Sequence, residues 1–273
     1  MLGAIIGDIV GSRLEWHNIK TKDFELFHKN CRPTDDSIMT LAVAKAILSC
    51  GGGCSKLGYQ TVVCMQELGR RYPDAGYGGR FHRWLKEAHP QPYNSYGNGS
   101  AMRVSPCAYA AKTLDEAKAL SKAVTEVTHN HPEGIKGAEA VTAAIFLALH
   151  GSGMAEIRNY VSENYYPMNF TLDEIRPKYT FDVSCQGSVP QAIMAFLEST
   201  GFEDAIRGAI SIGGDSDTIA AITGSIAGAY YGIPADIRAQ AVLYLDEVQT
   251  DILNRFEAKY GTIQEKEAEK DTP

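Results

Sequence analysis

The chain has 273 residues, of which 44% are hydrophobic and 22% charged, so its composition excludes fibrous, low-complexity and wholly disordered classes. Asp and Glu number 33 against 26 Lys and Arg, and the resulting charge of -7 argues against binding to nucleic-acid phosphates. The apolar N-terminus has no basic region and is interrupted by Asp8, and no later segment reaches the ~20 apolar residues of a membrane helix. We therefore expect a cytoplasmic protein that binds neither nucleic acid nor a membrane.

The six cysteines are scattered without a Cys-x-x-Cys pair. This pattern favours neither a disulfide framework nor a structural zinc site, and predicts buried, reduced thiols. They are Cys31, Cys50, Cys54, Cys64, Cys107 and Cys185.

Apolar residues recur at helical spacing along the chain, and no sustained period-two alternation indicates a sheet. The pattern predicts an all-α fold with one domain over residues 1–263 and a charged tail over 264–273. Gly- and Pro-rich stretches separate the helices, and the break at 164–187 is long enough for a functional loop or lid. The predicted helices cover residues 2–12, 35–49, 56–71, 79–88, 101–111, 115–127, 133–150, 154–163, 188–198, 202–211, 216–231 and 235–259.

Two predicted helices begin with acidic residues. In the first, Thr34 precedes Asp35 and Asp36, and the apolar positions that follow have helical spacing. Thr34 as the N-cap and Asp in the first turn, favoured by the helix dipole, would explain this pattern locally.

The second acidic start, Gly213-Gly214-Asp215-Ser216-Asp217-Thr218, precedes a helix rich in Gly, Ala and Ser. Such small residues lower helix propensity and are typical of helices that pack closely, so we expect a central, buried helix. Buried carboxylates need a partner or a metal, and residues 210–231 contain no Lys or Arg.

If the two starts converge, four carboxylates and two Thr hydroxyls share one pocket. Oxygen ligands without Cys or His suit Mg²⁺ or Mn²⁺. Four carboxylates formally balance two divalent ions, so the pattern favours a two-metal site, with a single ion as the alternative.

Five segments together resemble one known family, the ADP-ribosylglycohydrolases or ADP-ribosyl-acceptor hydrolases, over nearly the whole chain. They are residues 3–11 with Glu15, residues 34–37, residues 97–103, Thr128-His129 and residues 213–218. The resemblance implies a compact orthogonal multi-helix domain with a binuclear magnesium or manganese centre. It also implies a hydrolase that removes ADP-ribose from a protein side chain or a small acceptor.

By position, the resemblance implies ligands for two Mg²⁺ or Mn²⁺ ions. It places Glu15 near the metals, and Glu15, Asp35 or Asp36 would move the proton in catalysis; a solvated surface acid is the alternative for Glu15. The implied ligands are Thr34, Asp35, Asp36, Asp215, Asp217 and Thr218.

The Ser95–Ser100 segment is glycine-rich, and its backbone N–H groups could hold a diphosphate without basic side chains. A plain turn before the next helix is the alternative, and His129 is either a substrate contact or a structural histidine. The residues expected to contact substrate are Ser95, Tyr96, Gly97, Asn98, Gly99, Ser100, His129 and Ser216.

The acceptor is less constrained. Arginine-cleaving relatives carry an acidic residue just before the Gly-Asn pair, where this chain has Ser95, so the resemblance leans to serine-linked ADP-ribose or O-acetyl-ADP-ribose. The alternative function is a noncatalytic ADP-ribose-binding or structural member of the family. A helical phosphohydrolase ranks last, because the chain has no adjacent His-Asp pair.

Overall fold

The computed structural model describes residues 1–50 and 54–261. These residues form fourteen α-helices and three short 3₁₀ helices with no β-strand, which confirms the all-α prediction. The predicted tail at 264–273 lies outside the described residues. The helices are α1 (Leu2–Gly11), α2 (Asp35–Ser49), α3 (Leu57–Arg71), α4 (Gly79–Trp84), α5 (Ser105–Ala110), α6 (Leu114–Thr125), α7 (Pro132–Leu149), α8 (Met154–Asn164), α9 (Leu172–Ile175), α10 (Cys185–Leu197), α11 (Phe202–Ile210), α12 (Ser216–Tyr231), α13 (Ala235–Ala241) and α14 (Glu247–Tyr260).

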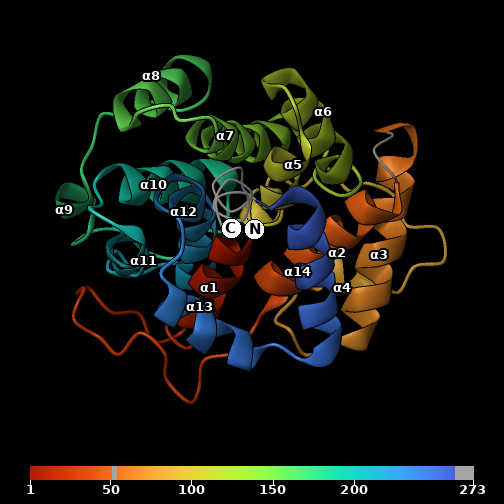
Figure 1. Ribbon diagram of the computed structural model, residues 1–273, viewed down its shortest axis with the longest axis horizontal. Helices are drawn as coiled ribbons and strands as arrows, with labels where there is room; N and C mark the ends of the chain where they lie inside the picture. Colours follow the sequence, from red (N-terminus) through yellow and green to blue (C-terminus); the bar gives the residue numbers. More distant parts are fainter. Residues whose placement is uncertain (51–53, 262–273) are drawn as a thin grey trace, which may run out of the picture.

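The N-terminal helix α1 and the late helix α12 pack together at the centre of the molecule (Figure 1). Their backbones approach closely because α1 carries glycine at every fourth position. A Cβ on Gly7 would lie 2.0 Å from the Ala220 carbonyl oxygen, and one on Gly11 would lie 2.5 Å from Asp217 Cα. This approach brings the acidic start of α12 beside α1, and residues 216–228 are all buried, as their small side chains predict.

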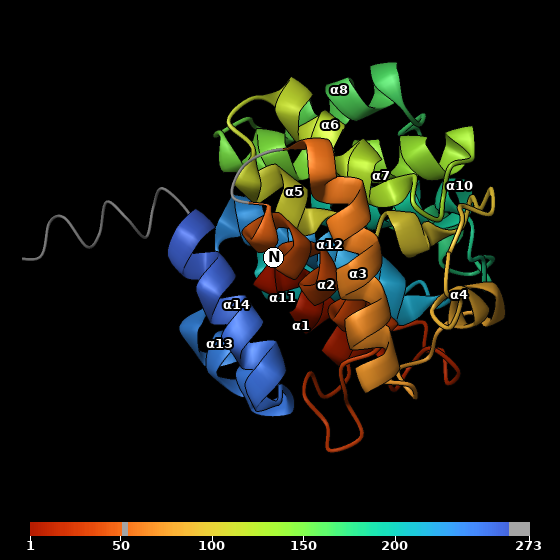
Figure 2. The same cartoon turned by 90° about the vertical axis from the view of Figure 1, so that its right-hand side faces the viewer.

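The remaining helices surround this pair. Helices α7, α10 and α11 pack against α12, while α2 packs against α1 and is covered by α3, α5 and α14. Helices α13 and α14 lie along one side of the molecule (Figure 2). None of the described helices is long and apolar enough to cross a membrane.

Several predicted boundaries were wrong. The helix predicted at 101–111 begins only at Ser105, because residues 98–100 form a 3₁₀ turn and Pro106 occupies the first turn of α5. The helix predicted at 235–259 is divided, since Asp246 and Gln249 form a capping box that starts α14. The break predicted at 164–187 contains the short helix α9, and α10 begins at Cys185 rather than 188.

No disulfide joins the described cysteine side chains, and all of them are buried, as predicted, except Cys50, which is half-buried. The side chain of Cys54 lies outside the described part of the chain. The described cysteines are Cys31, Cys50, Cys64, Cys107 and Cys185.

Candidate metal centre and ligand cavity

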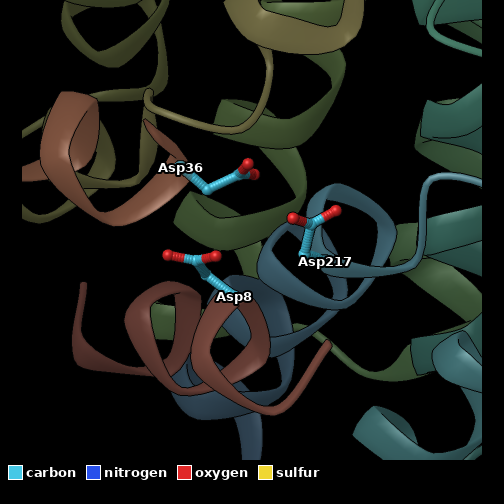
Figure 3. A group of neighbouring side chains, drawn as sticks. All are labelled: Asp8, Asp36 and Asp217. Atoms are coloured by element: carbon cyan, nitrogen blue, oxygen red, sulfur yellow. The ribbon is translucent and has the colours of Figure 1, made fainter. Parts of the chain in front are cut away.

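Three buried carboxylates from three helices form the centre of the site. Asp8 lies on α1, Asp36 on α2 and Asp217 on α12, and one oxygen of each lies within 4.8 Å of the others. Their carboxylates point toward a shared space (Figure 3). Glu15, Asp215 and Asp217 form a second group at the same spacing, whereas Asp35 belongs to neither group in the described chain.

Asp8 is held by hydrogen bonds to the start of α2. Its Oδ2 accepts the backbone N–H of Thr34 at 2.8 Å and that of Ser37 at 3.0 Å. The two hydroxyls also donate to Asp8. Thr34 is the N-cap residue of α2, as predicted, but its side chain makes no capping hydrogen bond, and Asp8 accepts the Ser37 N–H of the first turn instead.

Asp36 and Asp217 are connected by Thr218. The Thr218 hydroxyl donates to Asp36 Oδ2 at 3.1 Å, and its backbone N–H donates to Asp217 Oδ1 at 3.0 Å. On the other side, Asn98 Nδ2 donates to Asp215 Oδ2 at 2.7 Å. Asp36 Oδ1 is buried, and no described residue supplies a hydrogen bond to it.

The electrostatics of this cluster favour a bound cation. Burial, and then the Asp8 and Asp215 charges, raise the pKa of Asp35 to about 8. Burial also raises the pKa of Asp36 and Asp217 well above their usual range. Among residues 1–50 and 54–261, no Lys, Arg or His forms an ion pair with any of these carboxylates. The unpaired Asp36 oxygen and the all-oxygen donor set therefore fit a hard divalent cation.

Glu15 lies at the rim of the cluster and is half-buried. Burial, followed by repulsion from Asp215, raises its pKa to about 7, while the Trp16 indole N–H acts in the opposite direction. The exposed Trp16 ring stacks on Phe181, with centroids 5.1 Å apart. This stack joins the segment after α1 to the segment before α10 beside the acidic cluster.

A cavity of about 440 Å³ opens above the carboxylates, within the size range of small-molecule sites. Most of the residues predicted for the site line it, but Thr34, Tyr96, Ser100 and Ser216 do not. The predicted residues that line it are Glu15, Asp35, Asp36, Ser95, Gly97, Asn98, Gly99, His129, Asp215, Asp217 and Thr218.

Within the Ser95–Ser100 segment, several polar groups are used by the fold. The Asn98 N–H donates to the Val183 carbonyl at 2.7 Å and the Gly97 N–H to Ser95 Oγ at 3.2 Å, so neither is free for a ligand. The buried Ser100 hydroxyl donates to the Gly134 carbonyl at 2.8 Å.

The two other predicted contacts outside the cavity also have neighbours within the protein. The Ser216 hydroxyl donates to the Gly11 carbonyl at 3.4 Å, where α12 crosses α1. The half-exposed Tyr96 ring contacts His131 instead.

The structure adds two cations that the sequence analysis missed. Arg80 lies over the Tyr93 ring at 4.7 Å, and Arg103 is 1% exposed; both line the cavity. The wall beside the Ser95–Ser100 segment therefore carries basic charge, which contradicts our expectation of a diphosphate site without basic side chains. The signal available was Arg103 itself, a charged residue directly after the apolar Ala101-Met102 pair.

Comparison with known proteins identifies the family of the chain. The family model described as ADP-ribosylglycohydrolase matches residues 1–265. The chain belongs to this family. A solved structure described as an ADP-ribosylglycohydrolase-related protein complex has the same fold, with a TM-score of 0.70 and 22% identity over 95% of this chain and 94% of that one.

Two relatives match this chain at nearly equal identity, and the name of only one of them specifies an acceptor. The chain is 27% identical to the human (Homo sapiens) ADP-ribosylhydrolase ARH3, over 85% of this chain and 84% of that protein. It is 28% identical to the ADP-ribosylarginine hydrolase Tri1 of Pseudomonas putida (strain GB-1), over 85% of this chain and 70% of that protein. These similar identities therefore do not assign an acceptor to this chain.

Proposed function

We propose that this ADP-ribosylglycohydrolase family member is a metal-dependent enzyme that hydrolyses the glycosidic bond between ADP-ribose and an acceptor. The acceptor is a protein side chain or a small molecule. The observation that carries the proposal is the buried acidic cluster beneath the cavity, with Asp36 Oδ1 unpartnered and no cationic side chain paired to it in the described chain. A noncatalytic scaffold would have no use for so costly a group of buried charges.

The cluster would hold two Mg²⁺ or Mn²⁺ ions, which when bound supply charge neutralisation and Lewis-acid polarisation. The Thr34 hydroxyl donates its proton to Asp8 and the Thr218 hydroxyl donates to Asp36, so the oxygen lone pairs of both hydroxyls remain available as ligands. The proposed ligands are Thr34, Asp35, Asp36, Asp215, Asp217 and Thr218.

The side chains around the cluster orient the reacting groups. Asn98 orients Asp215 through its hydrogen bond. Asn98 Nδ2 also donates to Ser188 Oγ at 3.0 Å, which positions the amide. Glu15 moves the proton in our scheme. It is half-buried at the rim, and its raised pKa of about 7 allows it to hold or release a proton near neutral pH.

For the acceptor, we propose serine-linked ADP-ribose or O-acetyl-ADP-ribose in preference to arginine-linked ADP-ribose. Ser95 takes the place of the acidic residue expected for an arginine guanidinium, and its Oγ accepts the Gly97 N–H within the loop. A neutral hydroxyl at this position provides no charge complement for arginine.

Release of free ADP-ribose from serine-linked, arginine-linked and O-acetyl substrates, with Mg²⁺, Mn²⁺ or EDTA, tests this proposal. We expect metal-dependent turnover of the serine-linked or O-acetyl substrate and at least about tenfold slower release from arginine, equal to about 1.4 kcal/mol. Preferential cleavage of the arginine substrate would contradict the acceptor assignment. Binding of ADP-ribose without turnover of any substrate would instead indicate a noncatalytic member of the family.

A further inference from the structure

Among the residues that the structure describes, Arg103 is a buried cation without a carboxylate partner. It is 1% exposed, and none of the ion pairs in the described chain includes it. Its Nη2 donates to the Thr128 hydroxyl at 2.7 Å and to the Val124 carbonyl at 3.2 Å. A buried, uncompensated charge is costly, so its retention beside the cavity points to an anionic group that arrives with the ligand.

The Thr128 hydroxyl connects Arg103 to His129. Thr128 Oγ1 lies 2.7 Å from His129 Nδ1, and Thr128 is fully buried. Arg103 can only donate, so Oγ1 accepts from it and has one proton left to give. In the described chain His129 Nδ1 is the acceptor within reach of that proton. If Nδ1 carried its own hydrogen, the Thr128 proton would be buried without an acceptor.

This accounting fixes the tautomer of His129: Nδ1 accepts and Nε2 carries the hydrogen. Burial first, and then the charges of Arg103 and Arg80, hold the pKa of His129 well below its usual range, so the ring is neutral. Its Nε2 faces the glycines of the Ser95–Ser100 segment. A Cβ placed on Gly97 or Gly99 would lie 3.6 or 3.5 Å from Nε2. No described residue accepts a hydrogen bond from Nε2, which lies at the cavity wall.

We propose that Arg103 and Thr128 are positioning residues that hold His129 as a neutral Nε2–H donor to a phosphoryl oxygen of the ligand's diphosphate. The Arg103 charge beneath it complements the charge of the same diphosphate. The identity of the ligand as an ADP-ribose conjugate rests on the proposed function, whereas the tautomer rests on the hydrogen bonds alone. The wall thus binds an anion through the fixed Nε2–H donor of His129 and the buried charge of Arg103, and no lysine is among the described residues that line the cavity.

The direct test is the ring tautomer in the full-length chain. Long-range ¹H–¹⁵N correlation spectra distinguish Nε2–H from Nδ1–H rings, and a His129→Gln variant identifies the signals of this ring among the seven histidines. We expect a neutral Nε2–H ring in the parent protein. An Nδ1–H ring or an imidazolium at pH 7 would overturn the proposal whether or not the protein is active.

Thr128→Val removes the connecting hydroxyl, and Thr128→Ser retains it. We expect Thr128→Val to change the tautomer and to weaken ADP-ribose binding about ten- to hundredfold, as loss of a hydrogen bond to a charged group does. Thr128→Ser should retain the Nε2–H ring and stay within about threefold of the parent affinity. Thr142→Val is the matched control, because Thr142 is also fully buried but its hydroxyl has no partner in the described chain.

Parent-like tautomer and affinity in Thr128→Val would overturn the proposal. If Thr128→Val does not fold, two other measurements test the proposal. One is the His129 tautomer in the parent protein, and the other is the loss of ADP-ribose affinity in His129→Gln compared with Thr128→Ser. A chain that binds ADP-ribose through this histidine but hydrolyses no substrate would contradict the proposed function and leave this inference standing.

Discussion

The two sides of the cavity have opposite electrostatic character. The floor, formed by the starts of α2 and α12 beside α1, consists of buried carboxylates without cationic partners in the described chain. The wall beside the Ser95–Ser100 segment contains Arg80, the buried Arg103 and a neutral His129. The floor therefore favours cations and the wall favours anions, although the protein as a whole is acidic.

This contrast suits a ligand whose diphosphate contacts the wall while a neighbouring part of the ligand meets metal ions at the floor. In ADP-ribose the diphosphate lies between the adenosine and the distal ribose. The wall would hold the diphosphate, and the floor would then receive the distal ribose with its scissile bond. Each side can be altered separately, so the division of roles is open to test.

The largest expected effect comes from the floor. Asp217→Asn removes a charge from both carboxylate groups of the cluster, and we expect hydrolysis to fall at least about a thousandfold, or about 4 kcal/mol of transition-state stabilisation. Binding of ADP, which has the diphosphate but lacks the distal ribose, should be retained because the wall is intact. Steady-state rates and calorimetric titration with ADP measure the two effects.

Asp251→Asn is the matched control, since Asp251 is exposed on α14 and its one ion pair among the described residues is with Arg255 on the surface. Hydrolysis by Asp217→Asn within about tenfold of the parent would contradict the metal-centre account of the floor.

A second expected effect is a pH-dependent stabilisation by metal. The folded-state pKa of Asp35, about 8, is above its ordinary value of 3.8, so between these pH values the folded protein keeps a proton that the unfolded chain has lost. Stability of the metal-free protein therefore falls as pH rises from about 4 to 8. A divalent cation binds the deprotonated carboxylates, so it should stabilise more at pH 8 than at pH 6.

Thermal unfolding with and without Mn²⁺ measures this difference. Mn²⁺ at 100 times its Kd adds about 2.7 kcal/mol, which corresponds to roughly 5–10 °C in Tm for a protein of this size. At pH 6 the same concentration should produce a smaller shift. An equal or larger shift at pH 6 would show that the floor does not bind metal through these carboxylates.

The sequence predicted most of the carboxylates of the floor, but not Asp8, which holds the start of α2 in place. Asp36, Asp215 and Asp217 lie in short motifs at the starts of predicted helices, so the local sequence was enough to identify them as candidates. Asp8 is 26 residues from Thr34, and it looks only like an interruption in an apolar helix until α1 packs against α2. The division of the predicted helix at 235–259 was missed for a different reason, since the Asp246–Gln249 capping box interrupts an otherwise continuous helical pattern.

The wall was harder to predict because its pattern is tertiary. The Arg103 hydrogen bond spans 25 residues to Thr128, and in our proposal the tautomer of the His129 ring depends on that contact. Glycine and asparagine in the Ser95–Ser100 segment indicated a ligand loop. They gave no indication that its N–H groups at Gly97 and Asn98 are used within the protein.

The smallest expected effect concerns Asp8, the one member of the three-carboxylate group whose oxygens are already occupied. Both oxygens accept hydrogen bonds from Thr34 or Ser37, so we assign Asp8 to holding the start of α2 rather than to metal binding. Asp8→Asn keeps an oxygen that can accept the two N–H groups, and the Thr34 hydroxyl can rotate to accept from the new amide. Hydrolysis should stay within about tenfold of the parent at saturating Mn²⁺.

Asp8→Ala tests the structural part of the same assignment through the stability of the protein. It leaves the N–H groups of Thr34 and Ser37 buried without an acceptor and should lower the free energy of unfolding by about 1–3 kcal/mol, measured by urea denaturation. A loss of activity in Asp8→Asn as large as that of Asp217→Asn would show that Asp8 contributes its charge to the metal centre. Asp8, Asp36 and Asp217 would then act as three equivalent carboxylates, instead of Asp36 and Asp217 as ligands with Asp8 holding the start of α2.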